Sequence, residues 1–484
     1  MPTLPLLFLP QLPYSVTRNM PLGQEKRESM EWIYTVLEQA GSLFWGRGTI
    51  ALVLAAGVYF TFGTGLFPLR RWRLVLRQTA GSLFGAKTGE VSPFQAMSAA
   101  LGGTMGVGNI LGVAAALRLG GPGAVFWIWV GALAGMMTKF AEVTLAVKYQ
   151  SKTKQGRFGG PMYYMEQGLG LPLLGAIFAL ACTAGAFGTG GMTQSNAMAL
   201  SLWDSFHIPL WLTGLTTALL TLAIAKGGAK RILRLSSLVV PFMAACYLAG
   251  AGAVLFCHRQ NLLPSIALIF QDAFSPLAMG GGAVGFLSSQ GAAVGISKGI
   301  FTHEAGLGSA PIAHACAPAQ YPAQQGLWGI FEVFLDTVVV CTITALVILT
   351  TGAHTMPVAA HQMTAAAFST VFGVWGPRFL ACSIVFFAIA AIFSWCMYGQ
   401  QALKYLRPGK KGPQRAFTAL FSLGVFLGCV WPARAAWAAA DLLNGLMLLP
   451  NIFALFLLSP QVFRETRRLE AAFPSASKKN TAGE

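Results

Sequence analysis

Eleven apolar runs, each long enough to cross a lipid bilayer, constrain the fold of this 484-residue chain more than any other feature. About 20 predominantly apolar residues span the hydrocarbon core as a helix. Only 10% of the residues are charged, against roughly 25% in an average soluble domain. The apolar/polar alternation of a membrane barrel is missing, so the sequence predicts an all-α polytopic membrane protein. The runs lie near 48–68, 92–119, 122–150, 172–201, 208–226, 234–257, 277–301, 326–352, 375–402, 413–432 and 438–459.

The placement of basic residues explains the formal net charge of +17. Cytoplasmic loops of membrane proteins are enriched in Lys and Arg. Here Lys and Arg cluster after the first, third, fifth and ninth runs and in the tail, while the opposite loops carry few. Strict alternation predicts an inner-membrane protein with its N-terminus outside and its C-terminus in the cytoplasm. No basic run is interleaved with aromatic residues, so a nucleic-acid partner is not expected.

The ends of the chain differ from its middle. Residues 1–29 are rich in Pro and lack a small-residue cleavage site, so we expect a non-native or disordered extension and a natural start at Met20 or Met30. Residues 30–68 would form an amphipathic segment and the first span. Residues 460–484 would form a cytoplasmic tail.

Two glycine clusters interrupt apolar runs. The first extends from Gly102 to Gly108 in the second run, and the other from Gly280 to Gly291 in the seventh. An unwound backbone inside a crossing exposes amides and carbonyls to a solute at the bilayer midplane. Close helix packing through small residues is the alternative. A dinucleotide-binding loop does not fit, because the strand that should precede it is missing.

The two clusters lie five spans apart and therefore cross the membrane in opposite directions, as inverted repeats require. The sequence predicts two five-helix repeats, 92–257 and 277–459, with the first span as an addition. At a broken helix, one half-helix end attracts a carboxylate and the other attracts a cation. This arrangement predicts a solute with a carboxylate that moves together with a cation.

Ionisable residues inside the apolar runs support a functional site, because a charge at mid-bilayer costs at least about 2.5 kcal/mol. Lys139 and Glu142 are three residues apart on one helix, which predicts an ion pair between them. Asp336 lies near the middle of the eighth run with no basic residue within a helical turn. Asp336 and Thr337 are candidates for a cation site or gate, and a hydrogen bond between helices is an equal alternative.

Other kinds of site lack the necessary residues. The eight cysteines form no C-x-x-C pair and the six histidines no H-E-x-x-H motif, so neither a resident metal nor a cofactor is expected. No nucleophile and base fall together as an enzyme would require. A channel would need a continuous lined pore, which two off-axis broken helices do not provide. A protein that binds an amino acid without moving it stays open.

Several motifs resemble those of the alanine or glycine:cation symporter family, sodium-coupled carriers of small amino acids with a LeuT-type inverted-repeat fold. The similarity runs from about Met30 to about Arg468. The motifs are Gly-Val-Gly-Asn-Ile at 106–110, Leu-Gly-Gly-Pro-Gly at 119–123, Thr138 to Glu142, Gly159 to Tyr164, Glu304 to Pro311, Asp336-Thr337, and Asp441 through Asn444 to Asn451.

The resemblance implies a set of site residues. The substrate would be held by the two breaks and three side chains, namely Thr104, Gly106, Gly108, Asn109, Ser288, Ser289, Phe187, Gln194 and Trp395. Carbonyls of Gly102 and Met105 would face one sodium ion, and Asn109 would approach another. Three departures from the family pattern stand out: Ala390-Ala391 replaces a Ser-Thr pair, Thr302-His303 replaces Ser-Asn, and Gln400 replaces a glutamate.

The leading interpretation is a secondary active transporter that imports a small neutral amino acid, such as alanine or glycine, with Na+ by alternating access. Because alanine methyls cannot coordinate a cation, Ala390 and Ala391 keep an alternative open: a proton-coupled or exchange-type carrier with a lost or altered sodium site. We expect a monomer whose partners are the amino-acid substrate and the lipid bilayer.

Overall fold

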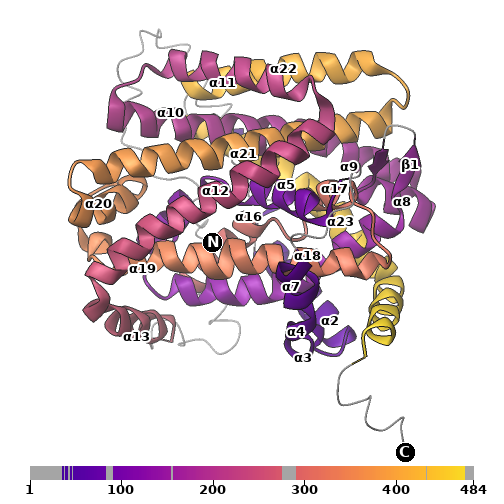
Figure 1. Cartoon of the computed structure of the whole chain (residues 1–484), viewed down its shortest axis with the longest axis horizontal. Coiled ribbons are helices and arrows are strands. Elements are labelled where there is room, and N and C mark those ends of the chain that lie inside the picture. The colour runs from indigo at the N-terminus through magenta and orange to yellow at the C-terminus, as the bar shows by residue number, and fades with distance from the viewer. Residues whose placement is uncertain are drawn as a thin grey trace, which may run out of the picture.

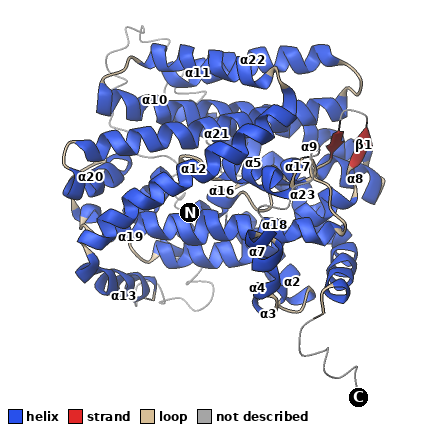
Figure 2. Ribbon diagram, in the orientation of Figure 1, coloured by secondary structure: helices blue, strands red, loops and turns tan. Residues whose placement is uncertain are grey.

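A computed structural model describes residues 35–36, 39–41, 44–45, 47–82, 91–153, 156–274, 290–431 and 433–474. Within these ranges the chain is helical apart from one short hairpin and the loops that connect the elements (Figures 1 and 2). The predicted extension 1–29 and most of the predicted amphipathic segment lie outside the described residues. So do Ser288, Ser289 and the glycine cluster up to residue 289.

The helices before the hairpin are α2 (Arg47–Gly63), α3 (Phe67–Arg70), α4 (Trp72–Gln78), η2 (Ala80–Ser82), α5 (Pro93–Thr104), η3 (Gly108–Gly112), α6 (Val113–Gly120) and α7 (Ala124–Lys148). The hairpin pairs β1 (Ser151–Thr153) antiparallel with β2 (Gly156–Phe158). The next group is α8 (Pro161–Leu169), α9 (Pro172–Gly185), η4 (Ala186–Met192), α10 (Thr193–Phe206), α11 (Leu210–Ala225), α12 (Gly228–Cys257), η5 (Arg259–Asn261) and α13 (Leu262–Ala273).

After residue 290 the described helices are α16 (Gln290–His303), α17 (Ala310–His314), α18 (Pro322–Val333), η6 (Phe334–Cys341), α19 (Thr342–Thr350), η7 (Ala353–Thr355), α20 (Ala360–Phe372), α21 (Trp375–Leu406), α22 (Lys411–Val430) and α23 (Ala433–Ala472). The last helix continues beyond residue 459, where the sequence predicted the final span to end.

Seven helices of the described chain are long and apolar enough to cross a membrane, and a bent pair raises the number to eight. That pair, Pro93–Thr104 with Gly108–Gly120, bends by 49°. The predicted all-α polytopic fold is therefore confirmed, whereas the count of eleven spans is not. Two of the predicted spans are the short apolar helices Gly48–Gly63 and Leu210–Ala225, and most of the run near 277–301 lies outside the described residues.

The helices form one bundle whose two ends differ in character (Figure 1). The hairpin, α8 and the connection from α21 to α22 lie at one end, which we call the basic end because Lys148, Lys404 and Arg407 belong to it. The short helices α13 and α20 lie at the opposite end.

Helix α7 runs through the middle of the bundle, packing against α2, α16 and α18. Every residue from Ala134 to Val147 is buried. A Cβ atom on Gly135 would lie 2.6 Å from the His303 ring, so the small residue permits a close approach of α7 and α16.

Candidate functional site

The first helix break lies where the sequence predicted it. Helix α5 begins in a capping box between Ser92 and Gln95 and ends at Thr104, after which Met105 leaves helical geometry (φ −74°, ψ 63°). Gln194 of α10 fills the break, and its Oε1 accepts a hydrogen bond from the Val107 amide at 3.1 Å. A Cβ atom on Gly106 would lie 2.7 Å from that oxygen, so glycine there allows Gln194 to reach the backbone of the break.

Three π-helical segments surround this break. Segment η3 carries Asn109, η4 carries Phe187, and η6 carries Asp336 and Thr337. A π-helical turn holds one more residue than an α-helical turn and frequently occurs at functional sites. These segments could not be predicted from the sequence, because no residue pattern distinguishes a π-helical turn from its α-helical neighbours.

Side-chain oxygens meet beside the first break. Asn109 Nδ2 donates to Asp336 Oδ1 at 2.8 Å and to the Asp336 carbonyl at 2.9 Å. Thr337 donates its hydroxyl to Asp336 Oδ2 at 2.8 Å, and the Thr302 hydroxyl lies 3.3 Å from that of Thr337. All four side chains are buried. We call Asn109, Thr302, Asp336 and Thr337 the oxygen cluster.

The oxygen cluster has unused capacity to bind a cation. Asn109 Oδ1 is buried and has no hydrogen-bond partner among the described residues. An orphaned buried oxygen is costly in a membrane interior unless a ligand satisfies it. Amide, carboxylate and hydroxyl oxygens are the donors that hard cations prefer. Asp336 also makes a hydrogen bond between helices, which was the alternative prediction for it, since Asn109 belongs to η3 and Asp336 to η6.

The remaining two residues predicted to face sodium lie elsewhere. A Cβ atom on Gly102 would lie 3.3 Å from Ser394 Oγ and 3.4 Å from the Ala390 methyl group, so this part of α5 faces α21. The Ser394 hydroxyl is already engaged, since it donates to the Ala99 carbonyl at 2.6 Å. The predicted cation residues therefore do not form a single group, since Asn109, Asp336 and Thr337 belong to the oxygen cluster while Gly102 faces α21.

Two predicted substrate residues contact other parts of the bundle. The Phe187 ring packs against Phe417 and Phe421 of α22, with ring centroids 5.4 and 5.8 Å away. Trp395 donates its indole N–H to Glu304 at 3.2 Å. Gln194 and Asn109 are the predicted side chains that the structure brings directly to the first break.

A second interruption separates α16 from α17, later in the chain than the glycine cluster that predicted one. Residues 304–309 are all buried and irregular, with positive φ at Glu304 (51°), Gly306 (94°) and Gly308 (77°). Such a conformation costs a non-glycine residue roughly 1–2 kcal/mol. Hydrogen bonds from Ser309 and Trp395 hold the Glu304 carboxylate in place.

Glu142 of α7 holds the backbone of the second interruption. Its Oε1 accepts hydrogen bonds from the amides of Gly306 and Gly308 at 3.0 and 3.1 Å, and from Asn451 Nδ2 at 2.6 Å. The predicted ion pair between Lys139 and Glu142 is therefore wrong. Lys139 Nζ instead lies 3.8 Å from Glu332 Oε1, because α18 packs against that face of α7.

Glu332 is the functional candidate that the sequence reasoning missed. It is buried in α18, four residues before Asp336 and thus on the same face of the spanning helix. Its Oε2 lies 2.9 Å from His314 Nε2, and its Oε1 accepts a hydrogen bond from Thr104 at 3.3 Å. The sequence does contain a signal for this residue, because Glu332 lies inside an apolar run, one helical turn before Asp336.

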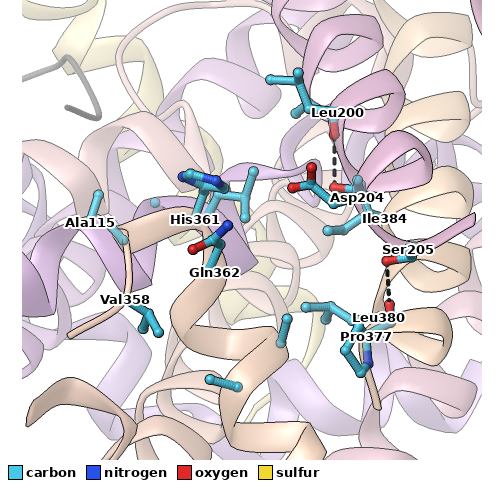
Figure 3. A pocket seen from close by; sticks show the side chains of 18 of the residues that line it. Ala115, Leu200, Asp204, Ser205, Val358, His361, Gln362, Pro377, Leu380 and Ile384 are labelled. Carbon is cyan, nitrogen blue, oxygen red and sulfur yellow. Dashed lines mark hydrogen bonds between the residues drawn. The ribbon is translucent and has the colours of Figure 1, made fainter. Parts of the chain in front are cut away.

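A cavity of about 340 Å³ opens in the half of the bundle away from the basic end. Figure 3 shows His361 and Gln362 of α20 on one side of it and Asp204 and Ser205 of α10 on the other. None of the predicted site residues within the described ranges lines it.

The cavity ends at a pair of aromatic rings near the first break. Its lining includes Phe301 and Trp437, whose rings pack with centroids 5.5 Å apart. A Cβ atom on Gly108 would lie 3.6 Å from the Phe301 ring, so this ring separates the cavity from the break.

Comparison with known proteins decides the family. The profile of the sodium:alanine symporter family matches residues 30–482. The chain belongs to the sodium:alanine symporter family. Membership confirms the resemblance drawn from the motifs. It also makes the chain a multi-pass membrane transporter and not an enzyme.

Named relatives cover most of the chain. It is 38% identical over 446 residues to the "Sodium/alanine symporter AgcS" of Methanococcus maripaludis, covering 90% of this chain and 96% of the relative. It is 40% identical over 445 residues to an uncharacterized transporter of Haemophilus influenzae, with coverage of 90% and 96%. It is 37% identical over 429 residues to the "Probable sodium/glutamine symporter GlnT" of Bacillus subtilis, with coverage of 88% of both chains.

Among solved structures, MhsT in complex with L-phenylalanine aligns with 79% of this chain and 100% of its own. The TM-score is 0.49 and the sequence identity 16%. At that level of overlap the alignment adds nothing to the family assignment.

Proposed function

We propose that this transporter carries a small neutral amino acid together with Na+ by alternating access. The observation that carries the proposal is the oxygen cluster beside the first break, with its unpartnered Asn109 oxygen. A sodium ion there would be coordinated by Asn109 Oδ1 and by oxygens of Asp336, Thr337 and Thr302. Its charge would attract a substrate carboxylate to the adjacent unwound backbone.

The first break is the better place for that carboxylate. The amides of Gly306 and Gly308 in the second interruption already bind the Glu142 carboxylate, which leaves them no capacity for a ligand. Around Gly106 the described backbone is held only by neutral groups, because the Gly106 amide donates to the Thr104 carbonyl at 2.8 Å and the Val107 amide donates to Gln194. A substrate carboxylate would therefore be placed between Gly106 and Gly108, next to the cation.

The cavity supports an entry route from one side. We place the basic end in the cytoplasm, which gives an inner-membrane protein with its C-terminus inside. The cavity then opens to the outside, and Phe301 with Trp437 forms the layer that a substrate must displace to reach the first break. This arrangement corresponds to an outward-facing state with a closed inner half.

The substrate is proposed to be alanine or glycine, because Gln194 and the Phe301 ring lie close beside Gly106 and Gly108 and leave little room for a larger side chain. Relatives named for alanine and for glutamine belong to the same family. Uptake of labelled alanine, glycine and glutamine into proteoliposomes, with and without an inward sodium gradient, distinguishes them. We expect uptake of alanine or glycine that falls at least tenfold without the gradient, since coupled ligands typically shift affinity about 5–150-fold.

The sodium claim has its own test in Asp336→Asn. Removing the negative charge should weaken sodium binding and lower sodium-driven uptake of alanine. Asp272, which binds the Gly123 amide outside the oxygen cluster, offers the control Asp272→Asn. Sodium-driven uptake by Asp336→Asn equal to that of the control would remove the assignment.

One observation favours a second candidate function. Near Gly102, α21 offers the methyl group of Ala390 and a single hydroxyl oxygen, that of Ser394, which donates its hydrogen to the Ala99 carbonyl. A carrier with a single sodium ion, a proton-coupled carrier or an exchanger would each fit this feature. Alanine uptake driven by a pH gradient in sodium-free proteoliposomes would support the proton-coupled form.

A further inference from the structure

Four helices meet in a buried charged network between the first break and the basic end. Glu332 of α18 contacts Lys139 of α7 at 3.8 Å, His314 of α17 at 2.9 Å and the Thr104 hydroxyl of α5 at 3.3 Å. Gln325 extends the network, with its Nε2 2.9 Å from His314 Nδ1. The Lys139, His314 and Glu332 side chains are at most 1% exposed.

The position of this network relative to the cavity suggests its role. The cavity occupies the other half of the bundle and stops at Phe301. On the side toward the basic end, every residue from Phe301 to Ala317 is buried, and this stretch includes the whole second interruption and α17. The charged network is therefore part of the closed half of any route that passes the first break.

A buried ion pair in a membrane protein contributes little net free energy to stability. Desolvation of the two charges offsets most of their attraction, yet removing one partner leaves the other charge uncompensated. Lys139 Nζ has no hydrogen-bond partner within the described residues. Without Glu332, the lysine would gain most from a conformation that admits water to this half of the protein.

We infer that the Thr104–Glu332–Lys139–His314 network is the inner gate of the transporter, and that Glu332 is the residue that keeps this gate closed. Thr104 is the last residue of α5 and lies at the first break, so the gate is directly connected to the proposed binding site. The Thr104 hydroxyl also lies 3.3 Å from the Leu101 carbonyl. A change at the break could thus switch this hydroxyl between the helix and the gate.

A native cysteine reports on the gate. Cys316 is 5% exposed and lies two residues after His314. Cys182 of α9 is fully buried and belongs to a helix outside the network, so it reports on general loosening of the fold. The rate at which N-ethylmaleimide modifies each cysteine can be measured by peptide mass spectrometry on the full chain in proteoliposomes.

We expect Glu332→Gln to raise the modification rate of Cys316 about tenfold or more, since a gate that opens part of the time exposes the thiol in proportion to the open population. The double variant Lys139→Met/Glu332→Gln removes both charges and should return the rate to within about twofold of the wild type. Glu465→Gln is the matched control, because Glu465 pairs with Lys148 of the same helix α7 away from the break.

The outcome is decided without substrate, so it can fail while the proposed function stands. An unchanged Cys316 rate in Glu332→Gln, a double variant as reactive as the single one, or a parallel rise at Cys182 would each overturn the inference. A second arm rests on the proposed function: alanine with Na+ should alter the Cys316 rate in the wild type and not in Thr104→Val. Equal responses in the two proteins would refute the connection through Thr104.

Discussion

The backbones of the two helix interruptions are held by different kinds of protein group. The segment between α5 and η3 is held by a neutral amide of Gln194, and beside it lies an amide oxygen of Asn109 without a partner in the described structure. The segment between α16 and α17 is held by the carboxylate of Glu142 and by Asn451. Within the described residues, the first interruption therefore has an unpaired oxygen beside it that can bind a ligand, whereas the amides of Gly306 and Gly308 in the second are already paired with Glu142.

This difference shows that unwound backbone alone does not identify a binding site. Both interruptions are glycine-containing, buried and irregular. They differ in whether protein groups already pair with their amides and with the oxygens beside them. A segment with an unpaired polar atom beside it can bind a solute, whereas a paired segment stabilises the bundle. The predictions below separate a structural effect at the second interruption from a ligand effect at the first.

The largest effect on stability should come from Glu142→Ala. The change leaves two backbone amides and the Asn451 amide without their shared acceptor, and each buried donor left unsatisfied costs about 1–3 kcal/mol. We expect the free energy of unfolding to fall by at least about 3 kcal/mol, measured by denaturant unfolding in detergent. Glu142→Gln retains one acceptor oxygen and should lose clearly less. Equal stability of the wild type and Glu142→Ala would contradict the bracing role.

A methyl group at the first break should act on the ligand. In Gly106→Ala the new Cβ would lie 2.7 Å from Gln194 Oε1, which forces the amide away from Val107. Overpacking of this kind costs typically 1–3 kcal/mol, so we expect alanine affinity to fall about 5–100-fold by calorimetry. Gly252→Ala is the control, because nothing lies within 4 Å of its added Cβ. Similar affinities in both variants would argue against binding at the first break.

A smaller effect is expected from Trp395→Phe. It removes the indole hydrogen bond to Glu304 while Ser309 still binds that carboxylate. A typical intramolecular hydrogen bond contributes about 0.5–1.5 kcal/mol net, and the free energy of unfolding should fall by that amount. The sodium dependence of uptake should be unchanged. A loss of sodium dependence would instead place Trp395 in the ligand site.

The smallest effect concerns α21. Ala390→Ser adds a hydroxyl group next to Gly102, where the present side chain offers a methyl group. If a second cation position exists between α5 and α21, the apparent sodium affinity for uptake should rise a few-fold, on the order of 1 kcal/mol. Sodium titration of alanine uptake measures the change. An unaltered titration curve would show that α21 takes no part in cation binding.

The sequence predicted the polytopic helical fold, the first break and Asp336 as an ionisable residue inside a membrane-spanning helix. These predictions rest on local signals: apolar run length, clustered glycines and charges inside the membrane. The partners of Lys139 and Glu142 could not be predicted, because two helices far apart in sequence, α18 and α23, supply them. The π-helical segments and the interruption at residues 304–309 likewise depend on tertiary packing, whereas the break predicted near residues 280–291 lies mostly outside the described residues and stays a prediction.

The central claim is that sodium binds in the oxygen cluster and supports substrate binding at the first break. Two asparagines, one at each interruption, provide the most direct measurement: the alanine dissociation constant as a function of sodium concentration in Asn109→Ala and Asn451→Ala. We expect Asn109→Ala to lose the sodium dependence, while folded Asn451→Ala retains it. Sodium dependence that persists in Asn109→Ala, or is lost only in Asn451→Ala, would contradict the account.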